Sequence, residues 1–347
     1  MNSKLVAIIF GGGGYRGAAQ VGWLKGILPE LVSRNIPIGY LGGASVGALN
    51  AGKLAEARTS QELLQKLREL ETTWLNVEKQ GPSSVFPLNK MKMILNFIHD
   101  KPFLDGKTLW DLLYNPLLAQ IPFDTAQVVQ SSIQLDIFMS DRSTGQQVIF
   151  SNRDPHIIQN PTIIAHAIVA SCSISLFFPS IRIGEELFGD CGYIRLDRAI
   201  EAGCDTIIIL LPYRENGNLD EPKGFASKLF AKIYTSYSSA VHELDREKIA
   251  SGRRIAEEIE VIRQLQEEIR PLIWKKSKRN TIDEFFRQSL ILLKDNPNLT
   301  KLRIIPLYIT QQSETLTLYK FAKGDISRII RDCEKTVEKN LKEILSM

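Results

Sequence analysis

The sequence predicts an α/β protein with a mainly parallel central sheet and helices on both faces of that sheet. Two apolar runs, Leu5–Phe10 and Thr206–Leu211, have the continuous hydrophobicity of strands that are buried on both faces. In addition, the first fifty residues have the pattern of a strand, a glycine-rich loop, a helix and a second strand. Such a βαβ unit places two parallel strands in one sheet, with a right-handed crossover between them.

The remaining elements follow from hydrophobic periodicity and turn residues. After the first strand we expect a helix over Ala18–Asn35, a second strand over Ile36–Gly43 and a helix after residue 45. The turn at Ser143–Gln146 predicts a hairpin, and Gly203 is typical of a helix end. Further strands are expected at Ser132–Ser140, Gln147–Phe150, Ile181–Gly184, Glu186–Gly189 and Leu302–Ile309, and further helices at 60–79, Leu109–Leu118, Thr162–Ser171, Asp197–Gly203 and Ile326–Leu345.

The domain organisation depends on a long charged segment, residues 225–269, whose pattern is helical. Predicted strands of the sheet lie on both sides of this segment, so a separate domain is not favoured. We therefore expect one domain over residues 1–347, with a helical elaboration at Glu221–Asn298 and a closing strand and helix at 301–347.

Composition limits the classes of function. A hydrophobic content of 44% with 24% charged residues is ordinary for a soluble globular protein, and a net charge of +4 does not call for nucleic acid. The four cysteines have no metal-ligand spacing and no signal peptide is visible, so we expect no cysteine metal site, reduced thiols and a cytoplasmic location. Leu5–Phe10 is too short for a signal sequence or a membrane span. The oligomeric state does not follow from the sequence.

The pentapeptide Gly43-Ala44-Ser45-Val46-Gly47 fits the G-x-S-x-G nucleophile elbow, a sharp turn from a strand into a helix. Gly43 and Gly47 are expected because neighbours two residues from the serine have no room for a side chain. The following helix directs its free N–H groups and its positive dipole end towards Ser45. The pentapeptide alone leaves a second interpretation open, a small-residue turn in which Ser45 is only a helix N-cap.

Two familiar interpretations of the neighbouring motifs fail. Gly12–Gly17 satisfies G-x-G-x-x-G, but a dinucleotide site needs an acidic residue at the end of the next strand, and none is there. An α/β-hydrolase needs several strands before its elbow, whereas only one βα unit precedes Ser45. We expect the four histidines, His99, His156, His166 and His242, to be surface or packing residues. A glycine loop that directs N–H groups at Ser45 favours an oxyanion hole instead.

These blocks together resemble the patatin-like phospholipases, in particular their bacterial-type members, over most of the chain. The similar segments are the loop Gly11–Gly17, the elbow Gly43–Gly47, the hairpin Ser140–Gly145, the block Ala170–Pro179 and the D-x-G element Asp190–Gly192. The resemblance implies a patatin-like three-layer fold. It also implies a lipid acyl hydrolase of phospholipase A type that acts on phospholipids or related lipids at a membrane surface, without metal or cofactor.

The resemblance assigns roles to particular residues. Ser45 and Asp190 are expected to form a catalytic dyad. Backbone N–H groups around Gly12, Gly13 and Gly14 are expected to form the oxyanion hole, with Arg16 holding that loop or meeting a lipid phosphate. One departure is Cys191, where the family usually has glycine; a positive φ there would cost about 1 kcal/mol or more. The alternative is therefore a catalytically impaired binding or regulatory module.

Two further segments have two interpretations each. Arg270–Arg279 mixes a tryptophan with cations, which is typical of an anionic membrane surface but also of a solvated loop. Met91, Met93, Phe97 and Ile98 can form an apolar flap over an acyl-binding cleft or simply belong to the core.

Overall fold

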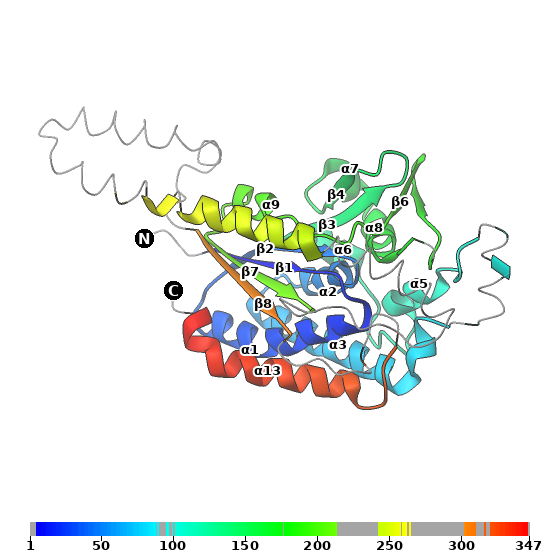
Figure 1. The fold of residues 1–347 in the computed structure, drawn as a ribbon, viewed down its shortest axis with the longest axis horizontal. Helices are drawn as coiled ribbons and strands as arrows, with labels where there is room; N and C mark the ends of the chain where they lie inside the picture. The colour runs from blue at the N-terminus through cyan, green and yellow to red at the C-terminus, as the bar shows by residue number, and fades with distance from the viewer. Residues whose placement is uncertain are drawn as a thin grey trace, which may run out of the picture.

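The computed structural model of the chain describes residues 5–87, 101–175, 177–213, 242–257, 259–261, 302–309 and 320–345, together with the single positions 89, 95, 96, 99, 264 and 316. Its centre is one mixed, mainly parallel sheet with the strand order β5-β6-β3-β2-β1-β7-β8, in which β4 pairs with β3 (Figure 1). The strands are β1 Val6–Phe10, β2 Ile38–Ala44, β3 Gln134–Asp141, β4 Gln147–Ser151, β5 Ile181–Ile183, β6 Glu186–Gly189, β7 Thr206–Leu211 and β8 Arg303–Tyr308.

The parallel part of the sheet determines where a site can form. Strands β3, β2, β1, β7 and β8 are parallel neighbours, while β4, β6 and β5 run antiparallel to their partners. All five parallel strands therefore have their carboxyl ends at the same edge. In α/β sheets ligands bind at this edge, where loops from neighbouring strands meet.

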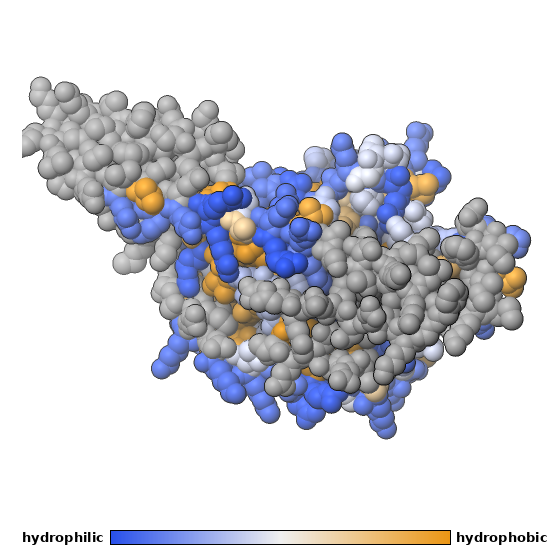
Figure 2. Space-filling view, viewed as in Figure 1, coloured by the Kyte–Doolittle hydropathy of each residue, from blue (hydrophilic) through white to orange (hydrophobic). Residues whose placement is uncertain are grey.

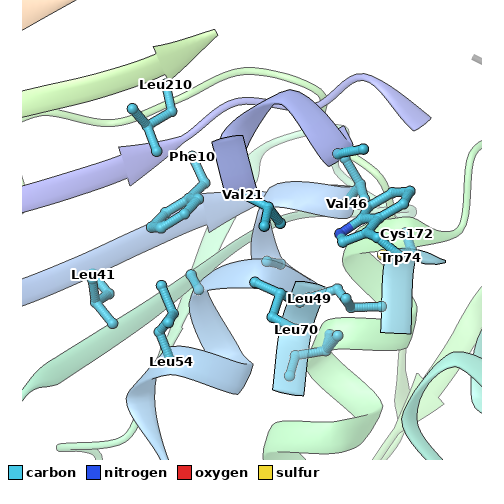
Figure 3. Close-up of a cluster of buried hydrophobic side chains, with 14 of the residues drawn as sticks. Phe10, Val21, Leu41, Val46, Leu49, Leu54, Leu70, Trp74, Cys172 and Leu210 are labelled. Carbon is cyan, nitrogen blue, oxygen red and sulfur yellow. The ribbon is translucent and has the colours of Figure 1, made fainter. Parts of the chain in front are cut away.

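The sheet lies between two layers of helices, as the sequence predicts. The side chains of β1 alternate between two hydrophobic clusters, with Val6 and Phe10 in one cluster and Ala7 and Ile9 in the other. The first cluster lies against α1, α2, α3, α8 and α13, the second against α9 and helix 242–257 (Figure 1). Figure 3 shows the first cluster, where Phe10 and Leu210 of the sheet face the helices.

The helices agree well with the predicted positions. They are α1 Ala18–Ser33, α2 Val46–Ala55, α3 Ser60–Gln80, α5 Lys107–Tyr114, α6 Thr125–Gln130, α7 Pro155–Gln159, α8 Thr162–Cys172, α9 Asp197–Glu201 and α13 Asp325–Ile344, with short 3₁₀ helices η1 Gly14–Gly17 and η2 Pro82–Ser84. Helix α5 ends at Tyr114 instead of the expected Leu118, because Pro116 disfavours a helical conformation at Asn115. Helices α6 and α7 were not predicted from the sequence.

The closing helix α13 packs closely against α1. A Cβ atom at Gly22 of α1 would lie 2.2 Å from the carbonyl oxygen of Ile330, and one at Gly26 would lie 2.6 Å from Cγ1 of Val337. The two helices therefore approach so closely that a side chain at either glycine would clash, at Gly22 with the backbone of α13. The outer surface of this layer is hydrophilic, as the lower edge of the molecule shows in Figure 2.

Several sequence predictions lie outside the described residues. They are the flap residues Met91, Met93, Phe97 and Ile98, the basic stretch 270–279, and most of the helical elaboration 221–298. The part of that elaboration that is described, residues 242–257, is helical as expected. Among the helices that the structure describes, none combines the length and the apolar character needed to cross a bilayer.

Candidate active site

Ser45 lies at the carboxyl end of β2, between that strand and α2. Its backbone has φ 55° and ψ −132°, in the positive-φ region that residues other than glycine rarely adopt. A Cβ atom at Gly43 would lie 2.4 Å from the carbonyl oxygen of Gly47, and one at Gly47 would lie 2.4 Å from that of Phe10. The glycine spacing therefore has the steric cause that the sequence suggests: the strand, the turn and the helix touch backbone to backbone.

The N-cap interpretation of Ser45 does not fit the geometry. The Ser45 side chain makes no capping hydrogen bond to α2. Instead, its backbone N–H donates to Oγ of Ser171 at 2.8 Å, and the Ser171 hydroxyl donates to the carbonyl oxygen of Phe138 at 2.6 Å. Ser171, on α8, thus links the elbow to strand β3. Ser171 belongs to the motif block Ala170–Pro179, but its role could not be predicted from the sequence.

The glycine loop lies directly over the elbow. A Cβ atom at Gly12 would lie 3.1 Å from Cβ of Ser45 and 3.6 Å from the carbonyl oxygen of Gly192. Gly13 packs in the same way against Pro212, which follows β7. Within the described part of the chain, the N–H groups of Gly12 and Gly13 have no hydrogen-bond acceptor. The glycine loop, the elbow and the Asp190 loop therefore lie together at Gly12.

Asp190 lies in the loop after β6 and is 5% exposed. Its Oδ1 accepts the N–H of Gly192 at 2.7 Å, and its own N–H donates to the carbonyl oxygen of Ser173 at 3.0 Å. Ser140 of β3 donates its hydroxyl to the carbonyl oxygen of Asp190 at 3.0 Å. The Asp190 loop is thus held by Ser140 near the end of β3 and by Ser173 directly after α8.

Cys191 does not have the positive φ that its place in the D-x-G element made a concern. The positive φ of the D-x-G element, 77°, is at Gly192, and the non-glycine residues with positive φ in the described chain are Asn35 and Ser45. Burial, with a smaller contribution from the Asp190 charge, raises the pKa of Cys191 to about 12, so this thiol stays neutral. Cysteine therefore fits this position without backbone strain.

A cavity opens beside Ser45, and its wall is almost wholly apolar. Its lining includes Val46 and Leu49 of α2, Trp74 and Val77 of α3, Phe86, and Leu109 of α5. Cys172 also lines it, and burial together with the nearby Asp190 charge raises the pKa of that thiol far above its usual range. Figure 3 shows Val46, Leu49, Trp74 and Cys172 gathered at this point. An apolar wall next to a serine is suited to an acyl chain.

Arg16 lies on η1, directly after the glycine loop, and is buried. The positive charge of Arg16 disfavours protonation of His242, on helix 242–257. Burial, Arg16 and Arg246 together lower the pKa of His242 to about 3. The His242 ring is stacked on Tyr213 with the ring centroids 3.6 Å apart. His242 is therefore a neutral packing residue, in agreement with one of the two roles that the sequence analysis expected for it.

A model of the patatin-like phospholipase family matches residues 8–197 of the chain. This match spans more than half of the chain and includes the glycine loop, the elbow and the Asp190 loop. The chain belongs to the patatin-like phospholipase family. The family resemblance that the motifs suggested is thereby confirmed, and the mainly parallel α/β sheet is that of a patatin-like fold.

Individual relatives match shorter segments. The rat patatin-like phospholipase domain-containing protein 7 is 30% identical over 91 residues, which are 26% of this chain and 6% of that protein. The neuropathy target esterase sws of Drosophila persimilis is 41% identical over 69 residues, or 20% of this chain and 4% of that protein. Both matches therefore span only a small part of the relatives. Among solved structures, VipD of Legionella pneumophila is 12% identical with a TM-score of 0.42, covering 99% of this chain and 67% of VipD.

Proposed function

We propose that this chain is a serine lipid acyl hydrolase of phospholipase A type, with Ser45 as nucleophile and Asp190 as general base. Its substrates are acyl esters of phospholipids or related lipids, met at a membrane surface. The family gives the coarse class, a patatin-like phospholipase, and the residue roles and the substrate are our proposal.

The observation that carries the proposal is the surroundings of Ser45. A positive-φ serine costs roughly 1–3 kcal/mol of backbone strain, and such strain concentrates at functional sites. The same serine lies at the N-terminus of α2, under a loop with unpartnered glycine N–H groups within the described chain, and at the wall of an apolar cavity. A structural turn requires none of these three features.

The reaction we propose has two halves. The Ser45 hydroxyl attacks the ester carbonyl carbon while its proton moves to the Asp190 carboxylate. The N–H groups of Gly12 and Gly13 stabilise the oxyanion, and the tetrahedral intermediate expels the lysolipid alcohol, which takes the proton from Asp190. Water then attacks the acyl-enzyme in the same way and releases the fatty acid. Arg16 is proposed to hold the glycine loop through this cycle.

The experiment is labelling with a fluorophosphonate, which reacts only with an activated serine, followed by hydrolysis of phospholipid vesicles. We expect labelling of the wild type, none of Ser45→Ala, and at least a hundredfold slower labelling of Asp190→Asn. Asp105→Asn is the matched control, because Asp105 also precedes a glycine but lies exposed, and within the described chain it accepts only a local hydrogen bond, from Lys107 N–H at 3.0 Å. Labelling of Ser45→Ala at the wild-type rate would refute the proposal. An unlabelled wild type would favour the binding or regulatory module.

A further inference from the structure

Asp245 is a fully buried carboxylate on helix 242–257, in the layer opposite the apolar cavity. It accepts two hydrogen bonds, one from the backbone N–H of Ile194 at 2.8 Å and one from the Tyr213 hydroxyl at 2.7 Å. Neither donor is on its own helix. The contact therefore joins three segments that are far apart in the sequence.

The first donor belongs to the loop that carries the proposed base. Residues 190–196, from Asp190 to Leu196, form neither helix nor strand, so backbone hydrogen bonds of a regular element do not fix them. At its start the loop is held by Ser140 and Ser173, and in its middle Gln147 Nε2 donates to the carbonyl oxygen of Tyr193 at 2.9 Å. These partners come from β3, the end of α8 and β4. At Ile194 the loop is held by Asp245 from helix 242–257.

The second donor belongs to the support of the glycine loop. Tyr213 follows Pro212 at the carboxyl end of β7, and Pro212 is the residue against which Gly13 packs, 2.6 Å from a Cβ atom built there. Tyr213 is also fixed by its stacking on His242, one turn before Asp245 on the same helix. One carboxylate thus connects the loop of the base with the segment against which the glycine loop packs.

The helix itself is firmly seated, which a positioning role requires. A Cβ atom at Gly252 would lie 2.5 Å from Cδ1 of Ile304 on β8 and 2.9 Å from Cδ1 of Leu196 at the end of the Asp190 loop. Ile249 and Ile259 are buried in the same cluster. Desolvation raises the pKa of Asp245 to about 7, because burial disfavours the charged form of the carboxyl. The hydrogen bonds from Ile194 and Tyr213 offset part of this cost.

We propose that Asp245 is a positioning residue for the reaction, which fixes the Asp190 loop relative to the glycine loop from helix 242–257. This inference rests on the proposed function of Ser45 and Asp190. It makes the described part of the helical elaboration a component of the active site, although this helix contributes no residue to the wall of the cavity.

The test compares Asp245→Ala, which removes both hydrogen bonds, with Asp245→Asn, whose amide oxygen still accepts the Ile194 N–H. Glu247→Ala is the matched control, because Glu247 is exposed on the same helix. For a soluble p-nitrophenyl ester we expect Asp245→Ala to lower kcat at least tenfold with KM within twofold. Asp245→Asn is expected within threefold of wild type, and Glu247→Ala unchanged. Hydrogen exchange is expected to accelerate at the Ile194 amide in Asp245→Ala only.

Each outcome decides the inference. A folded Asp245→Ala with wild-type kcat refutes it, as does an equal loss in Asp245→Asn and Asp245→Ala, which would indicate a need for the charge alone. If Asp245→Ala does not fold, Asp245→Leu, which fills the space of the carboxyl but accepts no hydrogen bond, replaces it. Unchanged kcat and Ile194 exchange in Asp245→Leu would refute the inference, and a fall in kcat with faster exchange supports it. An unlabelled wild type with normal Ile194 protection would instead overturn the proposed function alone.

Discussion

Replacing Asp245 by asparagine should change how the stability of the protein depends on pH. The carboxyl is fully buried, and desolvation raises its pKa to about 7, against an ordinary value of 3.8. The folded protein therefore binds a proton more tightly at this site than the unfolded chain does. The stability that this proton contributes is fully present at low pH and is lost as the pH rises through the folded pKa.

The size of the effect follows from the same values. At pH 5.5 the folded carboxyl is protonated and the unfolded one is ionised, which stabilises the fold by about 2 kcal/mol relative to the fully ionised reference. At pH 8.5 the group is ionised in both states and this stabilisation is gone. The wild type is therefore expected to lose about 2 kcal/mol of unfolding free energy between pH 5.5 and pH 8.5 through this group. Asp245→Asn lacks the titration and keeps that stability.

The assay is urea unfolding of wild type and Asp245→Asn at several pH values between these limits. The informative quantity is the difference between the two proteins, because the titration of His242 and of surface groups is common to both and cancels. We expect this difference to shift by about 2 kcal/mol in favour of the variant as the pH rises. Two curves that stay parallel within about 0.5 kcal/mol would show that Asp245 titrates normally and would refute the reasoning.

Four further predictions concern other parts of the fold. His242→Phe keeps the stacking on Tyr213 but removes the titrating imidazole. Because the pKa of His242 is lowered to about 3 in the folded protein, the wild type loses stability as the pH falls through the pKa that the histidine has in the unfolded chain. Urea unfolding should therefore find the unfolding free energy of the variant, relative to that of the wild type, about 2 kcal/mol higher at pH 5 than at pH 7.5. Cys191→Gly should leave ester hydrolysis within threefold of wild type, and a tenfold change would contradict the backbone assignment. Gly47→Ala, with its methyl 2.4 Å from a carbonyl oxygen, should lower the unfolding free energy by about 3 kcal/mol or more, which urea titration measures. Gly22→Ala should lower the thermal midpoint by several degrees while the labelling rate of Ser45 is kept, because its clash is with α13 and not with the cavity; equal midpoints would contradict the close packing.

The sequence is sufficient where a structural requirement is local. The elbow at Ser45 could be predicted because both of its glycines are required by contacts among residues close in sequence or in the adjoining strand. Helices α6 and α7 escaped the periodicity argument because they are too short to show one. Their signals were present in the caps: Asp124 accepts the N–H groups of Ala126 and Gln127, and Pro155 occupies the first turn of α7.

The sequence is insufficient where a contact depends on how distant segments pack. Ile194 and Asp245 are 51 positions apart. Nothing in the charged pattern of residues 225–269 distinguishes Asp245 from the exposed acidic residues around it. Its partners, Ile194 and Tyr213, come close only once helix 242–257 has packed on the assembled sheet, where Gly252 lies against β8. The doubt at Cys191 had a local reason: the D-x-G spacing alone does not say which residue takes the positive φ, and in the structure it is Gly192.

The strain at Ser45 shows how the whole architecture bears on one residue. A positive φ at a serine persists only if its surroundings fix it more strongly than the strain opposes it. Here the Ser45 N–H is held by Ser171, and the Ser171 hydroxyl is held in turn by the carbonyl oxygen of Phe138 on β3. At the flanking Gly43 and Gly47 the elbow lies directly against backbone atoms of Gly47 and Phe10, so the turn has little space in which to change its conformation. Relaxing the elbow would therefore break a contact between β2, β3 and α8, so the position of the serine is set by the sheet and not by the turn alone.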